Sequence, residues 1–259
     1  LKSKVITATE KQQLAKKSTL VSVATNIILT IGQVLAGVFS GSQGLIADGI
    51  HSLSDFVADF VVLLASRHSQ KAADADHHYG HLRYETAASL VLGLLLLSVG
   101  LGMIVNGVHK LLNPASLVQV HVMALWVSVI ALLAKETLFR YMLYHARRAG
   151  SSMLVANAWH ARSDAASSLV VAVGIIGNLL GFHLLDPLAA LLVGCMVGKM
   201  GFQFASQAMH ELMDRAASDE EVARVAECLR STPGVQGIHD LRTRKMGDLL
   251  VVDVHLEVN

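Results

Sequence analysis

Two histidine–aspartate pairs of identical spacing stand in apolar parts of the sequence. His51 and Asp55 are four residues apart, and His160 and Asp164 repeat that spacing in a later segment. Because side chains four apart share one face of a helix, each pair can offer an imidazole nitrogen and a carboxylate oxygen to one ion. Two such pairs supply four ligands, the number that a tetrahedral Zn²⁺ site uses. The spacing therefore predicts a metal site built from two helices.

Two further acids, Asp48 and Asp59, lie on the helical face that carries His51 and Asp55. Acidic side chains are rare inside a bilayer, and by default they are functional there. The alternative interpretation is a hydrogen-bonded network that only holds helices together. Such a network explains one pair well, but it explains two matching pairs poorly. We therefore favour the metal site, with Asp48 and Asp59 as accessory polar groups.

The elements around these residues are those of a membrane protein. Of the 259 residues, 53% are hydrophobic and 16% are charged, whereas a soluble domain carries roughly 25% charged residues. The two cysteines exclude a disulfide framework.

Six stretches are long enough to cross a bilayer, which takes about 20 apolar residues. The first begins at Ser18 and ends at the turn "VFSGSQG". The second to sixth cover roughly residues 45–67, 86–108, 117–140, 153–180 and 188–209. The fourth of the six is expected to continue past the membrane toward Arg147. The sequence therefore predicts six transmembrane helices, with the histidine–aspartate pairs on the second and the fifth.

The distribution of lysine and arginine predicts the orientation. These residues gather in the amino-terminal segment and in the second–third and fourth–fifth loops, whereas the other three loops hold only Lys110. Positive residues concentrate on the cytoplasmic side, so both termini are expected in the cytoplasm. A rise of about 1.5 Å per residue, counted from Arg67 on the second span and from Arg148 before the fifth, gives the depth of each group. Asp55 and His160 lie ~18 Å from the cytoplasmic end, and His51 and Asp164 lie ~24 Å from it. The four groups are therefore expected to meet near the midplane.

After the sixth span the composition becomes that of a small soluble α+β domain. Ser218 and Glu221 have capping-box spacing at the start of a charged helix. Residues 238–246 and 249–258 predict two strands joined by a tight turn. One helix and one hairpin cannot bury a core by themselves, so we expect this domain to be incomplete at its carboxy terminus. The expected organisation is a cytoplasmic segment (1–17), a transmembrane domain (18–213) and a cytoplasmic domain (214–259).

The loop between the second and third spans, "DADHHYGHLRYE", holds another dense group of candidate ligands: Asp74, His77, His78 and His81. The alternative is a solvated polar loop.

Together, "LIADGIHSLSD", "DHHYGHLRYE", "AWHARSD" and "GIHDLRTRKMGDLLVVDVHLEV" resemble the cation diffusion facilitators, proton-coupled exporters of divalent metal ions, over nearly the whole chain. The resemblance, to the YiiP-like bacterial branch, implies a homodimer in the inner (plasma) membrane. It also implies six spans per subunit and a cytoplasmic domain similar to a metallochaperone, with a ferredoxin-like fold. No enzymatic activity and no nucleic-acid partner are expected.

The resemblance also implies the roles of particular residues. The transport site falls on His51, Asp55, His160 and Asp164. A loop site falls on Asp74, His77 and His81, a cytoplasmic-domain site on His239 and His255, and a charge interlock on Arg83 and Asp214. The family's cytoplasmic domain continues through another helix and strand with further ligands, which puts a binuclear site here in doubt.

The ligand set favours Zn²⁺ as the transported ion and as a regulatory ligand. Some bacterial members carry Asp at the position of His51, whereas two histidines with two aspartates are typical of zinc-selective relatives. Fe²⁺, Mn²⁺, Co²⁺, Ni²⁺ and Cd²⁺ remain alternatives, because the affinity order alone does not set selectivity. Protonation of histidine can release the ion, so protons are the expected counter-transported ion in an alternating-access cycle.

Two other classes of protein could use the same ligands. An intramembrane metalloenzyme would activate water with them, but the sequence lacks an H-E-x-x-H motif and an obvious additional general base at the site. A metal sensor would use the carboxy-terminal domain as its output, but no recognisable signalling domain follows the spans.

Overall fold

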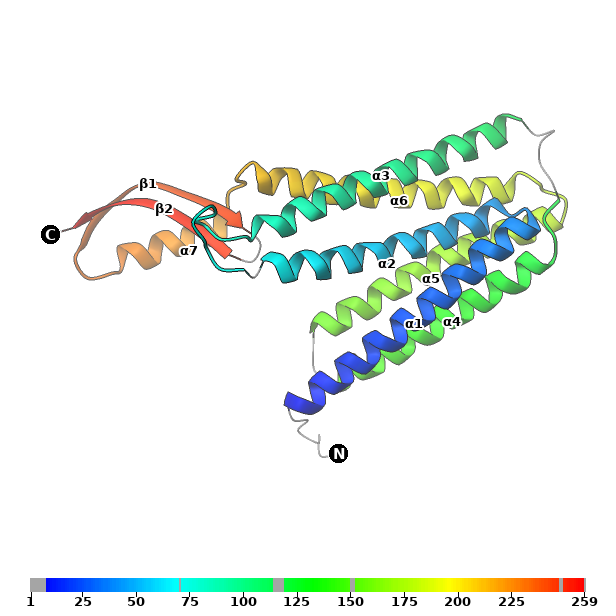
Figure 1. Ribbon diagram of the computed structural model, residues 1–259, viewed down its shortest axis with the longest axis horizontal. Coiled ribbons are helices and arrows are strands. Elements are labelled where there is room, and N and C mark those ends of the chain that lie inside the picture. Colours follow the sequence, from blue (N-terminus) through cyan, green and yellow to red (C-terminus); the bar gives the residue numbers. More distant parts are fainter. Residues whose placement is uncertain (1–7, 70, 114–118, 150–151, 247–248, 259) are drawn as a thin grey trace. The chain divides into compact units, whose positions relative to one another are not determined.

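The computed structural model describes residues 8–69, 71–113, 119–149, 152–246 and 249–258, and some side chains within these ranges, including those of Asp59 and His160, lie outside the description. In the described part, six long helices precede a small α/β segment (Figure 1). The helices are α1 (Ala8–Ser40), α2 (Gln43–Ser69), α3 (Arg83–Leu112), α4 (Met123–Ala149), α5 (Ser152–Leu179) and α6 (Leu185–Leu212). They are followed by α7 (Asp219–Arg230) and the strands β1 (Val235–Met246) and β2 (Leu249–Val258).

The long helices coincide with the six predicted spans, with two differences at their starts. Helix α1 begins ten residues before Ser18, because residues 8–17 hold good helix formers and no Gly or Pro. Helix α4 begins at Met123 rather than near residue 117. The residues just before it are held in a non-helical conformation, since the Val120 amide donates to Asn178 Oδ1 and the His121 amide to the Ser40 carbonyl.

Three helices of the described part are long and apolar enough to cross a membrane by length and composition: Leu20–Ser40, Arg83–Leu112 and Leu185–Leu212. Helices α2, α4 and α5 have ionisable residues in their interiors, which lowers their mean hydropathy. The predicted total of six spans therefore stays a prediction.

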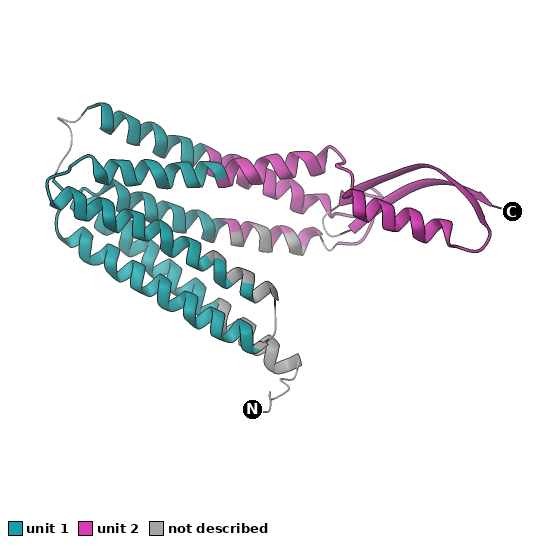
Figure 2. Ribbon diagram, turned by 180° about the vertical axis from the view of Figure 1, so that it is seen from behind, with its two compact units in different colours: residues 1–57, 98–199 teal, residues 58–97, 200–259 magenta. Residues whose placement is uncertain are grey.

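Contacts divide the chain into two compact units, residues 1–57 with 98–199 and residues 58–97 with 200–259 (Figure 2). In the first unit, α4 packs against α5 and α1. Fully buried side chains of its apolar core include Leu45, Val171, Ile175 and Val193.

The backbones of α3 and α6 touch in this first unit. A Cβ atom added at Gly100 would collide with the backbone of Gly198, and one added at Gly194 would lie 2.9 Å from the Cβ of Met103. Small residues at helix interfaces in membranes permit this close approach. Glycine is therefore required at these positions of the helix pair.

Helix α2 is capped by a residue far away in the sequence. Asp186, at the start of α6, accepts hydrogen bonds from Ser42 Oγ (2.6 Å) and from the Gln43 amide (2.7 Å). The first amides of a helix have no partner inside the helix. Asp186 thus fixes the point at which α2 begins.

In the second unit, α7 has the predicted capping box: Ser218 accepts from the Glu221 amide, and the Glu221 side chain accepts from the Ser218 amide. Strands β1 and β2 pair antiparallel, with His239 opposite His255. Strand β1 starts at Val235, three residues before the prediction, after Gly234 turns the chain at φ +95°. The predicted tight turn at residues 247–248 lies outside the described residues.

Candidate metal sites

Three of the four predicted transport ligands converge between α2 and α5. His51 Nδ1 lies 3.7 Å from Asp55 Oδ2 one turn along α2, and His51 Nε2 lies 4.0 Å from Asp164 Oδ1 of α5. Each residue offers one ligand atom, and these atoms all lie within 4.8 Å of one another. The side chains are 7% (His51), 16% (Asp55) and 17% (Asp164) exposed. The side chain of His160, the fourth predicted ligand, lies outside the described residues.

The spacing of these groups fits a small divalent cation. Tetrahedral Zn²⁺ holds nitrogen and oxygen ligands at about 2.0–2.2 Å, which places the ligand atoms about 3.4 Å from one another. With one ligand atom from each residue, the atoms lie within 4.8 Å of one another, so side-chain rotations that shorten these separations would close the group on an ion. Two carboxylates beside one imidazole would supply two negative charges, which matches the charge of the ion.

Asp48, one turn before His51, is bonded to another group of residues. Its fully buried carboxylate accepts from the Gln33 amide, from Ser167 Oγ (2.9 Å) and from Ser168 Oγ (2.5 Å). Lys135 Nζ of α4 lies 3.3 Å from both of its oxygens. Among the described residues, the ligand group around His51 does not include Asp48. The side chain of Asp59, the other accessory acid, lies outside the description.

Sequence reasoning missed Lys135, which is 2% exposed. Its ammonium also donates to Ser52 Oγ of α2 (3.1 Å) and to Ser168 Oγ of α5 (2.7 Å). Lys135 was detectable as an ionisable residue inside an apolar stretch, a feature that is functional by default in a membrane segment. Its partners depend on how three helices pack, which the sequence pattern does not reveal.

The loop between α2 and α3 brings a second ligand group together. Asp74 Oδ1 lies 3.3 Å from His77 Nδ1, and Asp74 Oδ2 lies 3.5 Å from His81 Nε2. The Asp76 amide donates to Asp74 Oδ1 (3.2 Å) in an Asx turn, and the His77 amide donates to the same oxygen (2.9 Å), so the loop folds onto its own carboxylate. His78, the fourth residue of the predicted cluster, is absent from this group in the described part of the chain.

Asp74 is held in its ionised form. A hydrogen bond from the Lys71 ammonium (2.7 Å), together with the His77 amide, keeps the pKa of the Asp74 carboxyl well below its usual range. The carboxylate is therefore available to a cation at any physiological pH. Binding at this group would depend on pH through its imidazoles, which bind metal in the neutral form.

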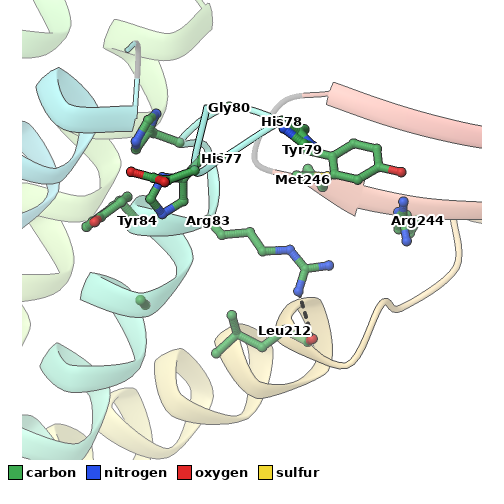
Figure 3. Close-up of a pocket in the computed structure, with 12 residues that line it drawn as sticks. His77, His78, Tyr79, Gly80, Arg83, Tyr84, Leu212, Arg244 and Met246 are labelled. Carbon is green, nitrogen blue, oxygen red and sulfur yellow. Dashed lines mark hydrogen bonds between the residues drawn. The ribbon is translucent and has the colours of Figure 1, made fainter. Parts of the chain in front are cut away.

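A cavity of about 660 Å³ lies beside this loop group (Figure 3). Arg83, at the start of α3, donates to the Leu212 carbonyl at the end of α6 (3.4 Å) and forms an ion pair with Asp214. Arg244 of β1 lies 3.8 Å from the other Asp214 oxygen, and its guanidinium lies over the Tyr79 ring at 5.5 Å. The structure thus brings the predicted Arg83–Asp214 pair together, with Arg244 as an additional partner.

The two histidines predicted for the cytoplasmic-domain site are opposite each other in the β1–β2 ladder. Each has a carboxylate neighbour of its own: His239 Nε2 lies 3.1 Å from Glu257 Oε1, and His255 Nδ1 lies 3.5 Å from Asp240 Oδ2. Within the described residues they do not join a group of three ligands.

Long apolar helices around a group of side chains that could hold a metal ion, followed by a small α/β unit, indicate a membrane protein with a candidate cation site. The model of the cation efflux transmembrane domain matches residues 19–213, and that of the cation efflux protein cytoplasmic domain matches residues 217–259. The chain belongs to the cation efflux family, the cation diffusion facilitators.

Individual relatives agree with this assignment. The chain is 34% identical to metal tolerance protein C1 of Arabidopsis thaliana over 90% of its own length, and it spans about half (53%) of that protein. It is 28% identical to the manganese efflux system protein MneP of Bacillus subtilis, over 97% of this chain and 86% of the relative. It is 30% identical to the cation-efflux pump FieF of Serratia proteamaculans, over 95% of this chain and 82% of the relative.

Proposed function

We propose that this protein exports divalent transition-metal cations from the cytoplasm, with Zn²⁺ as the preferred ion, in exchange for protons. The observation that carries the proposal is the convergence of His51, Asp55 and Asp164, whose ligand atoms lie within 4.8 Å of one another on two helices. His160, four residues before Asp164, would complete a site of two imidazoles and two carboxylates. Family membership supports a divalent metal ion as the substrate.

The choice of Zn²⁺ rests on the chemistry of the ligands. Two imidazoles and two carboxylates form the four-coordinate nitrogen and oxygen environment that Zn²⁺ adopts readily. Ions that prefer more oxygen ligands, such as Mn²⁺, are less well served by two histidines. The relative MneP is named for manganese efflux, so Mn²⁺ is the first competitor to test.

Proton exchange follows from the same ligands. Imidazole and carboxylate bind a metal ion only when deprotonated, so metal binding releases protons and protonation releases the metal. A site that faces the cytoplasm would load the ion, and a site that faces the opposite, more acidic side would exchange it for protons. An inward proton gradient would then drive export by alternating access.

The remaining groups are assigned to regulation and assembly. The transmembrane domain (18–213) would lie in the inner membrane with both termini in the cytoplasm, including the segment 1–17. Asp74, His77 and His81 would bind a regulatory metal ion, and the Arg83–Asp214 pair would link the loop to the carboxy-terminal domain (214–259). That domain would join two subunits in a homodimer, with a metal ion at His239 and His255.

Reconstituted vesicles test the transport proposal directly. Purified protein in proteoliposomes with an imposed pH gradient should accumulate Zn²⁺, and a protonophore should abolish the accumulation. Asp55→Ala protein serves as the control for leakage. Gradient-independent Zn²⁺ flux would remove proton coupling from the proposal, and metal binding without any flux would favour the sensor or metalloenzyme classes instead.

A further inference from the structure

We propose that Lys135 determines the composition of the transport site, because it neutralises Asp48 and prevents that carboxylate from becoming a further metal ligand. The inference rests on the proposed function, since it concerns the selectivity of the same site. It assigns a specificity-determining role to a residue of α4, a helix that contributes none of the four proposed ligands.

Asp48 is placed where a ligand could be. It stands three residues before His51 on α2, so the two side chains share a helical face. The hydroxyls of Ser167 and Ser168 on α5 also connect it to Asp164, because both Oγ atoms lie within hydrogen-bond distance of the Asp164 carbonyl oxygen (2.7 and 3.3 Å). An acid in this position and without a partner would face the ion that His51 and Asp164 bind.

The hydrogen-bond partners of Asp48 occupy its whole accepting capacity. A carboxylate has about four lone-pair sites. Four donor groups surround this one: the Gln33 amide, the hydroxyls of Ser167 and Ser168, and the Lys135 ammonium. Lys135 carries the only charge among these donors. It is therefore the charged partner of this fully buried carboxylate.

Lys135 is itself fully used by these contacts. Its ammonium has three protons, and its acceptors are the Asp48 carboxylate, Ser52 Oγ and Ser168 Oγ. Ser52 follows the ligand His51 directly, and Ser168 lies one turn after the ligand Asp164. The lysine is thus held at the level of the metal site without a place in the ligand group.

The consequence concerns selectivity. With Asp48 neutralised, the proposed site has two carboxylates and two imidazoles, a set that suits Zn²⁺. Release of Asp48 would add one negative charge and up to two oxygen ligands. Sites rich in carboxylate suit Mn²⁺ better than sites rich in imidazole. Removal of the Lys135 charge should therefore shift the preference of the site from Zn²⁺ toward Mn²⁺.

The test compares Zn²⁺ and Mn²⁺ binding and transport in four full-length variants: Lys135→Met, Asp48→Asn/Lys135→Met, Asp55→Ala and Lys199→Met. Lys199 lies on α6, is exposed and is the matched lysine control. Lys135→Met is expected to lower the Zn²⁺-over-Mn²⁺ preference by roughly tenfold or more. The double variant has no carboxylate at position 48 that could join the site, so its preference should return to within about twofold of the wild type. Lys199→Met should match the wild type.

Each result has a definite meaning. An unchanged preference in Lys135→Met would overturn the inference, and so would an equal defect in the single and double variants, since the lysine itself would then be required. If Lys135→Met does not fold, Asp48→Asn replaces it: an uncompensated ammonium beside the site should weaken binding of both ions, and the double variant should restore it. Absence of that weakening would also overturn the inference. Wild-type binding by Asp55→Ala would instead reject the proposed function.

Discussion

His51 Nε2 on α2 lies 4.0 Å from Asp164 Oδ1 on α5, so one imidazole bridges two helices that are far apart in the sequence. The second nitrogen of the same ring faces Asp55 at 3.7 Å. A single ion can bind only one nitrogen of an imidazole, so an ion held by all three residues would take one nitrogen of His51 and one oxygen from each carboxylate.

Asp55→Ala and Asp164→Ala are each expected to abolish transport in a protein that remains folded. Loss of an outer-shell partner of a metal ligand already costs roughly 10–100-fold in affinity or activity, so loss of a charged ligand should exceed about 100-fold. Zn²⁺ flux in proteoliposomes is the measurement, with Asp253→Ala, an exposed acid of β2, as the control. Near-normal flux in either ligand variant would reject the proposed site.

His51→Asp is expected to broaden selectivity toward larger ions such as Cd²⁺. A carboxylate adds charge and can bind through one or two oxygens, which relaxes the tetrahedral arrangement that favours Zn²⁺. Competition between Zn²⁺ and Cd²⁺ for uptake measures the change. Unaltered discrimination between the two ions would count against His51 as a selectivity ligand.

Replacement of Asp74, His77 and His81 by alanine should change the apparent metal affinity or the conformational balance while transport continues. These residues lie in the loop between α2 and α3, where a cation needs no escort through hydrocarbon. We expect flux to fall by less than about tenfold, compared with more than about 100-fold for the transport ligands. Complete loss of flux in the triple variant would contradict this division of roles.

The capping box of α7 makes a prediction about pH. A hydrogen bond from the Ser218 amide, and to a smaller extent one from the Lys245 side chain, lowers the pKa of Glu221 from 4.5 to about 2. Because the folded-state pKa is depressed, this contribution to stability is complete above pH 4.5 and is lost as the pH falls toward about 2. Glu221→Gln should therefore speed hydrogen exchange of α7 amides at pH 7, after correction for intrinsic rates, and the difference from the wild type should shrink below pH 4. A constant difference across this range would show that the charge of Glu221 is not involved.

Zinc is expected to reduce the separation or the mobility of the two carboxy-terminal domains in the proposed dimer. A metal ion held by His239 and His255 would draw the domains together. Cys228 of α7 is exposed and can carry a spin label once Cys195, which is also exposed, is replaced by serine. Electron–electron resonance should give shorter or narrower distances with Zn²⁺ than with chelator, and His239→Ala/His255→Ala should remove the response. Identical distributions in the parent protein would indicate a domain that only dimerises.

Local patterns in the sequence predicted those parts of the molecule that depend on nearby residues. The four-residue spacing of His51 and Asp55 predicted their shared face, and the Ser218–Glu221 spacing predicted the cap of α7, which the structure confirms. Equal depth on antiparallel helices correctly placed Asp164 beside His51. The first two predictions succeed because helix geometry alone determines them, and the third because it needed only the antiparallel direction and depth of two helices.

Hydrogen bonds between distant segments that involve no recognised motif were not predicted. Lys135 was read as part of an apolar span, because its role depends on Asp48 and Ser168 arriving from two other helices. The start of α4 was placed too early, because the Asn178 side chain and the Ser40 carbonyl hold the preceding residues in a non-helical conformation. Hydropathy and spacing contain no information on such long-range hydrogen bonds.

The glycine contact between α3 and α6 limits the motions available to this protein. At Gly100 the backbone of Gly198 leaves no room for a side chain, and at Gly194 an added Cβ would lie 2.9 Å from the Cβ of Met103. Rotation of either helix about its own axis would bring a larger residue into this contact, so we expect the two helices to move together in this segment. Any pivot that exposes His51 and Asp164 to alternate sides must therefore lie elsewhere than between α3 and α6 at this level.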